Sequence, residues 1–175
     1  MTPEALLERV VALLPAARAL PLAEMRGQSV VMLPRDGLAE ALTALRDAPD
    51  TRFEQLSDVT AVDYLGRTPR FEVVYQLNSL THRHRLRVKV AVDEADATVP
   101  SVVPVWRSAL WAEREVFDLM GIRFAGHPDL RRLLMYAGFE GHPLRKDYQL
   151  MRRQPLVPER DPVSQPWFPP TGDGR

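Results

Sequence analysis

The chain has 175 residues, of which 45% are hydrophobic and 26% charged, and its formal net charge at pH 7 is zero. These values are typical of an ordinary soluble globular protein of one domain. A net charge of zero gives the protein as a whole no electrostatic attraction to nucleic acid or to anionic lipid. The sequence contains no cysteine. This excludes disulfides, thiolate catalysis, and zinc fingers or iron–sulfur clusters held by thiolates of this chain.

The N-terminal segment carries no targeting signal that we identify. Glu4 and Glu8 make it acidic, and no basic region precedes a small-residue cleavage site, so no signal peptide is predicted. No apolar run approaches the ~18 residues that a membrane-spanning helix needs. We therefore expect a cytoplasmic chain that reaches a membrane only through a partner.

The N-terminal third predicts a helix, a strand and a second helix. Thr2 suits the cap position and Pro3 the first helical position, and apolar residues then recur one turn apart until Pro15 ends the pattern. Residues 28–33 form a short apolar run typical of a strand. An Ala- and Leu-rich helix is expected over residues 36–47.

Three consecutive segments, residues 52–65, 70–80 and 84–93, alternate apolar and polar side chains. The inward-facing positions of the second and third segments are Phe71, Val73, Tyr75, Leu77, Leu86, Val88, Val90 and Val92. Alternation with period two indicates an antiparallel sheet with one solvated face. With the neighbouring helices, it predicts an α+β fold: an antiparallel or mixed sheet with helices packed on one face.

A link containing Pro100 and Pro104 leads into a helix over about residues 106–120, which Gly121 is expected to end. Residues 1–121 are therefore interpreted as an α+β domain. Residues 122–150 are expected to be irregular, and residues 151–175 form a proline-rich extended tail. The Trp167-Phe168 pair in that tail is an apolar anchor that favours contact with another protein.

Residues 121–153 carry an excess of positive charge. The segment contains seven basic residues (123, 131, 132, 145, 146, 152 and 153) and three acidic residues (129, 140 and 147), which gives a net charge of +4. Arginine clusters of this kind commonly meet carboxylates across protein–protein interfaces. Residues 122–150 are therefore expected to be a basic docking segment.

A helical wheel of residues 109–120 places Glu113 within the apolar arc, and Arg114, Glu115 and Asp118 on the opposite side. A carboxylate in an apolar arc needs a cation or several donors, or else is protonated. Glu113 could be a general acid with a raised pKa, but we favour a structural ion pair with an arginine from the downstream loop. Arg114 and Asp118 are expected to form a surface or interface pair.

The four histidines do not have the spacing of a metal site. His82 and His84 lie two residues apart, and His127 and His142 each stand in a Gly-His-Pro tripeptide. Zinc needs three or four ligands in suitable geometry. Because proline favours an extended backbone for the residue before it, each tripeptide is interpreted as a chain turn with a hydrogen-bonding ring inside. Each turn would direct a basic cluster, Arg131-Arg132 or Arg145-Lys146, outward.

Nucleic-acid binding and intrinsic catalysis find little support. Arg83, Arg85, Arg87 and Lys89 form a basic stripe along one predicted strand, but the outward positions carry no aromatic side chain on which bases could stack. The sequence has no phosphate-binding glycine pattern and no Ser/His/Asp spacing. A solvated face or a protein interface is the favoured interpretation of the stripe.

The segment EREVFDLMGIRFAGHPDLRRLL (Glu113–Leu134) resembles the signature of the 30 kDa-type subunit of respiratory complex I, which in bacteria is the C subunit of NADH-quinone oxidoreductase. EGHPLRKDY (140–148) is similar to the second block of that family, and the resemblance covers roughly residues 50–150. It implies that the signature and interface residues are Glu113, Arg114, Glu115, Asp118, His127, Arg131, Arg132, His142, Arg145, Lys146 and Asp147.

The resemblance implies a non-redox core subunit of the peripheral arm of a complex that passes electrons from NADH to quinone and translocates protons. No catalytic centre or cofactor is expected in this chain. FMN, iron–sulfur clusters and quinone would belong to partner subunits, chiefly the 49 kDa-type quinone-site subunit, which this chain would scaffold, and neighbouring iron–sulfur subunits. The implied location is the cytoplasmic side of the cell membrane. Two alternatives remain: the equivalent subunit of a ferredoxin-, F420H2- or hydrogenase-type membrane complex, or an RNA-binding α+β module.

Overall fold

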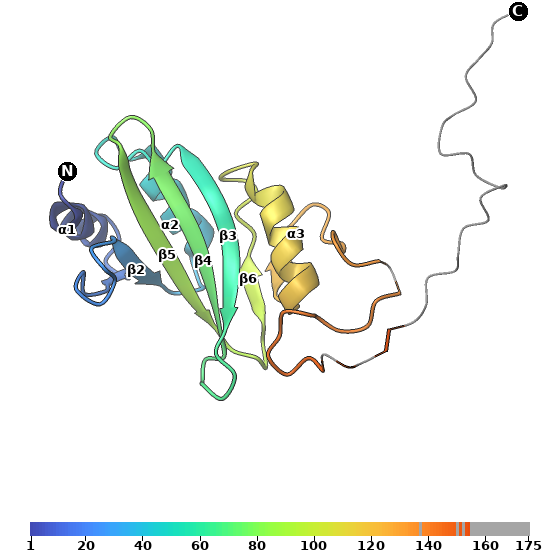
Figure 1. Ribbon diagram of the computed structural model, residues 1–175. Helices are drawn as coiled ribbons and strands as arrows, with labels where there is room; N and C mark the ends of the chain where they lie inside the picture. The colour runs from blue at the N-terminus through green and yellow to red at the C-terminus, as the bar shows by residue number, and fades with distance from the viewer. Residues whose placement is uncertain (137, 150, 152, 155–175) are drawn as a thin grey trace, which may run out of the picture.

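The computed structural model describes residues 1–136, 138–149, 151, 153 and 154. The helices and strands are α1 (Pro3–Leu13), β1 (Arg18–Ala19), β2 (Val30–Leu33), α2 (Leu38–Asp47), β3 (Gln55–Asp63), β4 (Phe71–Ser79), β5 (His84–Val92), β6 (Thr98–Pro100), α3 (Ala109–Met120) and β7 (Arg123–Ala125). Figure 1 shows α2 behind the main sheet, with α3 beyond the β3 edge. The fold is therefore α+β, as the sequence predicts.

The main sheet has five strands in the order β1-β2-β5-β4-β3. The hairpins β3–β4 and β4–β5 are antiparallel, whereas β2 pairs with β5 in parallel through the register Val30↔Arg87 to Leu33↔Val90. The parallel pair makes the sheet mixed. A second, two-stranded sheet joins β6 and β7 in parallel.

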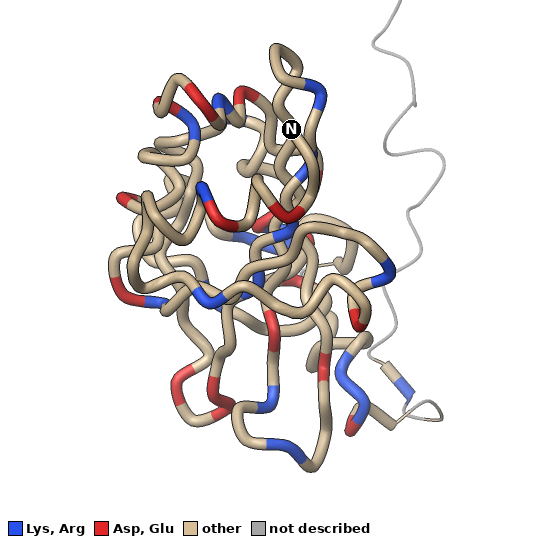
Figure 2. The backbone as a smooth tube through the Cα atoms, turned by 90° about the vertical axis from the view of Figure 1, so that its left-hand side faces the viewer, with Lys and Arg blue, Asp and Glu red and all other residues tan. Residues whose placement is uncertain are grey.

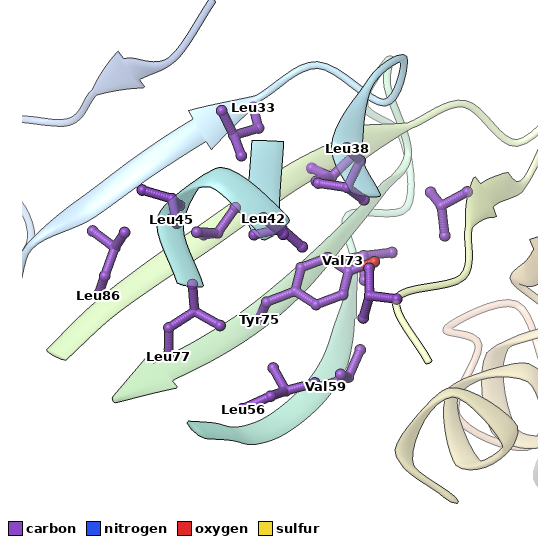
Figure 3. Close-up of a cluster of buried hydrophobic side chains, with 14 of the residues drawn as sticks. Leu33, Leu38, Leu42, Leu45, Leu56, Val59, Val73, Tyr75, Leu77 and Leu86 are labelled. Carbon is purple, nitrogen blue, oxygen red and sulfur yellow. The ribbon is translucent and has the colours of Figure 1, made fainter. Parts of the chain in front are cut away.

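The core lies between the inner face of the main sheet and α2. Leu38, Leu42 and Leu45 of α2 are fully buried, and Figure 3 shows them above Val73, Tyr75 and Leu77 of β4. The inward positions predicted for β4 and β5 are all buried. The period-two pattern therefore identified the inner face of the sheet correctly.

Most helices and strands of the structure are a few residues shorter than the sequence predicts. The predicted helix over 36–47 begins at Leu38 because Gly37 has a left-handed backbone, with φ 73°, and the predicted helix over 106–120 begins at Ala109. Thr2 caps α1 as predicted, its hydroxyl accepting from the Ala5 N–H. β1, β6 and β7 were not predicted, since strands of two or three residues are too short for a period-two pattern.

One of the unpredicted strands corrects the interpretation of residues 122–150 as irregular. β7 lies inside that segment and pairs with β6, and Ile122 and Phe124 are buried with the core. The hydrophobic core therefore extends past Gly121. The predicted proline-rich tail falls almost entirely outside the described residues, and so does its Trp167-Phe168 anchor.

Candidate functional site

The candidate site is formed by α3 and the residues that fold back over it. We call residues 126–149, without residue 137, the C-terminal segment. Figure 1 shows the first part of this segment, in lighter orange, beside α3 on the side away from the sheet, and the later, darker part passing below α3. One face of α3 packs on β3, where Val116 and Leu119 lie close to Val59 and Ala61. The C-terminal segment covers the other face.

Glu113 is fully buried, as the helical wheel predicts. One carboxylate oxygen accepts from the Ser101 hydroxyl and the other from the Val102 N–H, both at 2.7 Å. Burial disfavours the charged form and raises the pKa of Glu113 to about 7, although both hydrogen bonds oppose the shift. Burial, with the Glu113 carboxylate second, also raises the pKa of Tyr75. The hydroxyl of Tyr75 has no hydrogen-bond partner among the described residues.

The predicted ion pair between Glu113 and a downstream arginine is wrong. The side chain points toward the link before α3, which supplies Ser101 and Val102, whereas the downstream arginines lie on the other face of the helix. The structural role that we favoured for Glu113 fits its full burial, because a substrate cannot reach a carboxylate that has no exposed surface.

Asp118 is the carboxylate that meets a downstream arginine. It is fully buried. Its Oδ1 accepts from the Arg132 guanidinium at 2.7 Å, and its Oδ2 accepts from three consecutive backbone N–H groups, those of Leu133, Leu134 and Met135, at 2.7 to 2.9 Å. Burial acts to raise the pKa of Asp118, but the hydrogen bonds from Met135, Arg132, Leu134 and Leu133 hold it below its ordinary value. Asp118 therefore anchors the C-terminal segment as a charged group.

Arg114 also binds the C-terminal segment. Its guanidinium donates to the carbonyl oxygens of Arg131 at 3.1 Å and of Arg132 at 3.0 Å, and it lies over the Trp111 ring. The predicted pair between Arg114 and Asp118 is not formed: both side chains are buried, and each holds a different part of the segment. The C-terminal segment thus covers Arg114 and Asp118, whereas Glu115 on the same side of α3 stays exposed.

The two Gly-His-Pro turns contain hydrogen-bonded rings, as predicted. The Nε2 atom of His127 lies 3.0 Å from the Leu110 carbonyl oxygen, and its Nδ1 accepts from the Asp129 N–H at 3.0 Å. The Nδ1 atom of His142 lies 2.9 Å from the Asp118 carbonyl oxygen. Both rings therefore tie their turns to α3. Burial lowers the pKa of His142, which favours the neutral ring.

The basic clusters do not point uniformly outward, contrary to the prediction. Arg132 is directed inward to Asp118, and Arg145 donates from Nε to the Met120 carbonyl oxygen at 2.6 Å. Arg131 and Lys146 are exposed. One residue of each pair thus stabilises the fold, and the other remains on the surface. Glu115 of α3 is exposed as well.

An arginine that the sequence interpretation missed joins the C-terminal segment to the sheet. Arg70 is buried and donates to both oxygens of Asp63 at 2.8 and 2.9 Å and to both oxygens of Asp147 at 2.8 and 3.1 Å. It also pairs with Glu94. Hydrogen bonds from Arg70 are the largest cause that lowers the pKa of both Asp63 and Asp147. The sequence offered a signal for this pair, because Asp63 and Arg70 lie at the facing ends of two consecutive predicted strands, residues 52–65 and 70–80.

The polar groups of this site attach the C-terminal segment to α3 and to the sheet. The buried carboxylates of the site accept hydrogen bonds from arginines, backbone N–H groups and the Ser101 hydroxyl. The described part of the chain contains no group of three or more His, Cys, Asp or Glu residues placed to hold a metal ion. In the same described part, no helix is long and apolar enough to cross a bilayer. The arrangement holds an irregular segment against a compact α+β body.

Residues 31–154 match the family model described as "Respiratory-chain NADH dehydrogenase, 30 Kd subunit". The chain is 56% identical to the C subunit of NADH-quinone oxidoreductase from Caulobacter sp. (strain K31) over 71% of its own length and 58% of the relative's. It is 48% identical to the equivalent subunit of Citrifermentans bemidjiense over 79% of its own length and 82% of the relative's. The chain thus spans less than two thirds of the Caulobacter protein.

Two solved structures share the fold. The trypsin-resistant fragment (1–134) of Nqo5 is 36% identical, with a TM-score of 0.59 over 74% of this chain and all of the fragment. A chain of the archaeal membrane-bound sulfane sulfur reductase has a TM-score of 0.69 over 86% of this chain and 88% of that one, and its 22% identity supports the fold alone. On the family match across residues 31–154, which contain the whole α3 network, the chain belongs to the 30 kDa subunit family of the respiratory-chain NADH dehydrogenase.

Proposed function

We propose that this chain is the C subunit of an NADH-quinone oxidoreductase, a non-redox core subunit in the peripheral arm of complex I. The complex would transfer electrons from NADH to quinone and couple this transfer to proton translocation. The observation that carries the proposal is the match of residues 31–154 to the 30 kDa subunit family. The relatives at 56% and 48% identity, which are named as subunits of the same machine, support it.

In this proposal the chain contributes attachment and the redox groups belong to its partners. The sequence has no cysteine with which to ligate an iron–sulfur cluster, and the buried Asp118 of α3 is used to hold the C-terminal segment. FMN, iron–sulfur clusters and quinone would lie in other subunits. The chain would scaffold the 49 kDa-type quinone-site subunit and neighbouring iron–sulfur subunits, on the cytoplasmic side of the membrane.

The family signature residues are proposed to act in two groups. The first group holds the C-terminal segment and the link before α3 in place; it consists of Glu113, Arg114, Asp118, His127, Arg132, His142 and Arg145. Glu115, Arg131 and Lys146 lie on the surface, where they would meet a partner, and the half-exposed Asp147 is held by Arg70. Charge on such a rim steers association and selects partners more than it adds affinity.

Affinity purification of the tagged chain from native membranes tests the proposal. Co-purification of NADH-binding flavoprotein and iron–sulfur subunits is the expected result. Recovery with hydrogenase-type or F420H2-oxidising subunits instead would favour the alternative complexes, which the names of the relatives do not favour. The isolated chain should show no flavin or iron–sulfur absorbance and no NADH oxidation.

A further inference from the structure

Three neighbouring arginines on one face of β5 and the turn before it lack a carboxylate partner. Elsewhere in the fold, Arg46, Arg70 and Arg132 each pair with an aspartate. In contrast, Arg83, Arg85 and Arg87 form no ion pair with any described residue; the nearest polar contact of the Arg87 side chain is the Gln76 side-chain oxygen at 3.4 Å. Unpaired guanidinium groups that stand together repel one another, and an anionic partner would relieve this repulsion.

These arginines line one open groove of about 570 Å³. Pro3 and Leu6 of α1 and the residues Gln28 and Ser29 before β2 form its other wall. No aspartate or glutamate is among the lining residues, so no acidic side chain of the groove neutralises the positive charge of the arginines. The side chains of Arg83 and Arg85 are exposed.

The groove contains one position of β5, Arg85, that is unpaired on the side facing β2. β2 begins its parallel ladder with β5 at Arg87, whose N–H donates to the Ser29 carbonyl oxygen at 2.9 Å. Arg85 lies two residues earlier, so its N–H and C=O point to the same edge. β5 continues through Arg85 to His84 on the β4 side alone, and no described backbone group pairs with Arg85 at the groove edge. An open edge of this kind accepts an extended segment by strand addition.

We propose that this groove binds an extended acidic segment of a neighbouring subunit, which adds to the β5 edge at Arg85 and places carboxylates against Arg83, Arg85 and Arg87. The backbone edge gives the segment its extended form, and the arginines select acidic side chains. Met1 and Pro3, which also line the groove, offer a small apolar contact to the side chains that alternate with the acidic ones.

A protein segment fits this groove better than RNA does. Single-stranded RNA is held by aromatic side chains on which its bases stack, and the lining contains no Phe, Tyr or Trp. Strand addition also requires a partner with backbone N–H and C=O groups, which RNA lacks. Charge alone would not discriminate between the two, but the open strand edge does.

The inference rests on the proposed function, because the acidic segment is assigned to a subunit of the same complex. The experiment therefore starts with purification of the tagged complex, carrying a photo-reactive p-benzoylphenylalanine in place of Gln28. If the wild-type tagged chain recovers no complex, the proposed function fails. If the complex is recovered, irradiation and mass spectrometry test the groove.

A cross-link from position 28 to an acidic segment of another subunit is the expected result. No cross-link within the recovered complex, or one to RNA, to lipid or to a basic segment, would overturn the inference. Amide hydrogen exchange gives an independent measurement: the Arg85 N–H should exchange more slowly in the complex than in the isolated chain. Equal exchange in both states would also contradict strand addition.

Charge reversal supplies the matched control. The Arg83→Glu/Arg85→Glu variant alters two exposed side chains and should reduce the cross-link yield by about tenfold, since like charges then face each other. Arg107→Glu changes an exposed arginine outside the groove and should leave the yield unchanged. Circular dichroism of both variants confirms that they fold. A yield insensitive to the Arg83/Arg85 reversal would argue against carboxylate recognition.

Discussion

At the scale of single residues, α3 shows how neighbouring donors decide the charge of a buried carboxylate. Glu113 and Asp118 are both fully buried on the same helix. Two neutral donors do not offset burial at Glu113, whose pKa rises to about 7. A guanidinium and three backbone N–H groups do offset it at Asp118, whose pKa falls below its ordinary value. Burial alone therefore does not predict the charge state.

The raised pKa of Glu113 predicts a pH-dependent loss of stability. The folded chain keeps a proton on Glu113 between pH 4.5 and about 7, whereas the unfolded chain has released it. The protonated Glu113 therefore contributes to the free energy of unfolding. This contribution is fully present below pH 4.5 and is lost as the pH rises through about 7. At about 1.4 kcal/mol per pKa unit, the loss is about 3 kcal/mol.

Glu113→Gln removes this titration and tests the prediction. Urea unfolding of both proteins across this pH range gives the difference in their free energies of unfolding, and wild type should lose about 3 kcal/mol relative to the variant. Burial lowers the pKa of His84 and His142, but their titration is common to both proteins and cancels. A constant difference would contradict the raised pKa.

Gly121, at the end of α3, is predicted to tolerate no side chain. Its backbone is left-handed, with φ 75°, and an added Cβ would lie 2.6 Å from the His142 ring and 2.8 Å from the Arg145 guanidinium. Gly121→Ala should therefore destabilise the protein by about 2–3 kcal/mol in urea unfolding, from backbone strain and the clash together. Gly66→Ala is the matched control: its φ is 87° but nothing lies within 4 Å, so it should lose only about 1 kcal/mol. Equal losses would show that the His142 contact is unimportant.

At the scale of elements, the sequence predicts best where the pattern repeats. Strands β3, β4 and β5 are long enough for alternation to reveal their inner face. The parallel partnership of β2 with β5 leaves no local signature, because it depends on a pairing of segments more than 50 positions apart. The sequence also did not show that the C-terminal segment covers Arg114 and Asp118, because this segment has no periodicity of its own.

The contact between Arg70 and Asp147 is predicted to control how tightly the C-terminal segment is held. Arg70→Lys keeps the charge but cannot reproduce the forked contacts with Asp63 and Asp147. The Lys146 N–H, which donates to Asp63 at 2.8 Å, should then exchange with solvent about tenfold faster in a hydrogen-exchange measurement. Arg67→Lys, at an exposed position in the same turn, should not change that rate. Unchanged exchange in Arg70→Lys would mean that other contacts hold the segment.

At the scale of the whole molecule, the net charge is zero, but charged residues differ locally: some pair within the fold and others remain exposed. Figure 2 shows basic and acidic residues interspersed over the described chain. Many of these residues neutralise one another within the fold, as Arg70 does with Asp63 and Arg132 with Asp118. Lys146 and Arg131 remain exposed on the C-terminal segment, although Arg131 also pairs with the half-exposed Asp129 at 2.9 Å. The same sequence cluster thus supplies residues that stabilise the fold and residues that remain exposed at the surface.

This division predicts that assembly and stability can be separated by mutation. Arg131→Glu/Lys146→Glu reverses two exposed charges of the C-terminal segment, so the free energy of unfolding should change by less than about 1 kcal/mol. Recovery of partner subunits in affinity purification should fall, because reversed charges oppose a complementary surface.

Arg132→Ala, in contrast, leaves the buried Asp118 without its guanidinium and should destabilise the isolated chain by about 3 kcal/mol. Arg18→Glu/Arg67→Glu, with the same charge change at exposed sites outside the segment, controls for net charge. Equal recovery of the two charge-reversed variants would show that the C-terminal segment does not dock through its exposed basic residues.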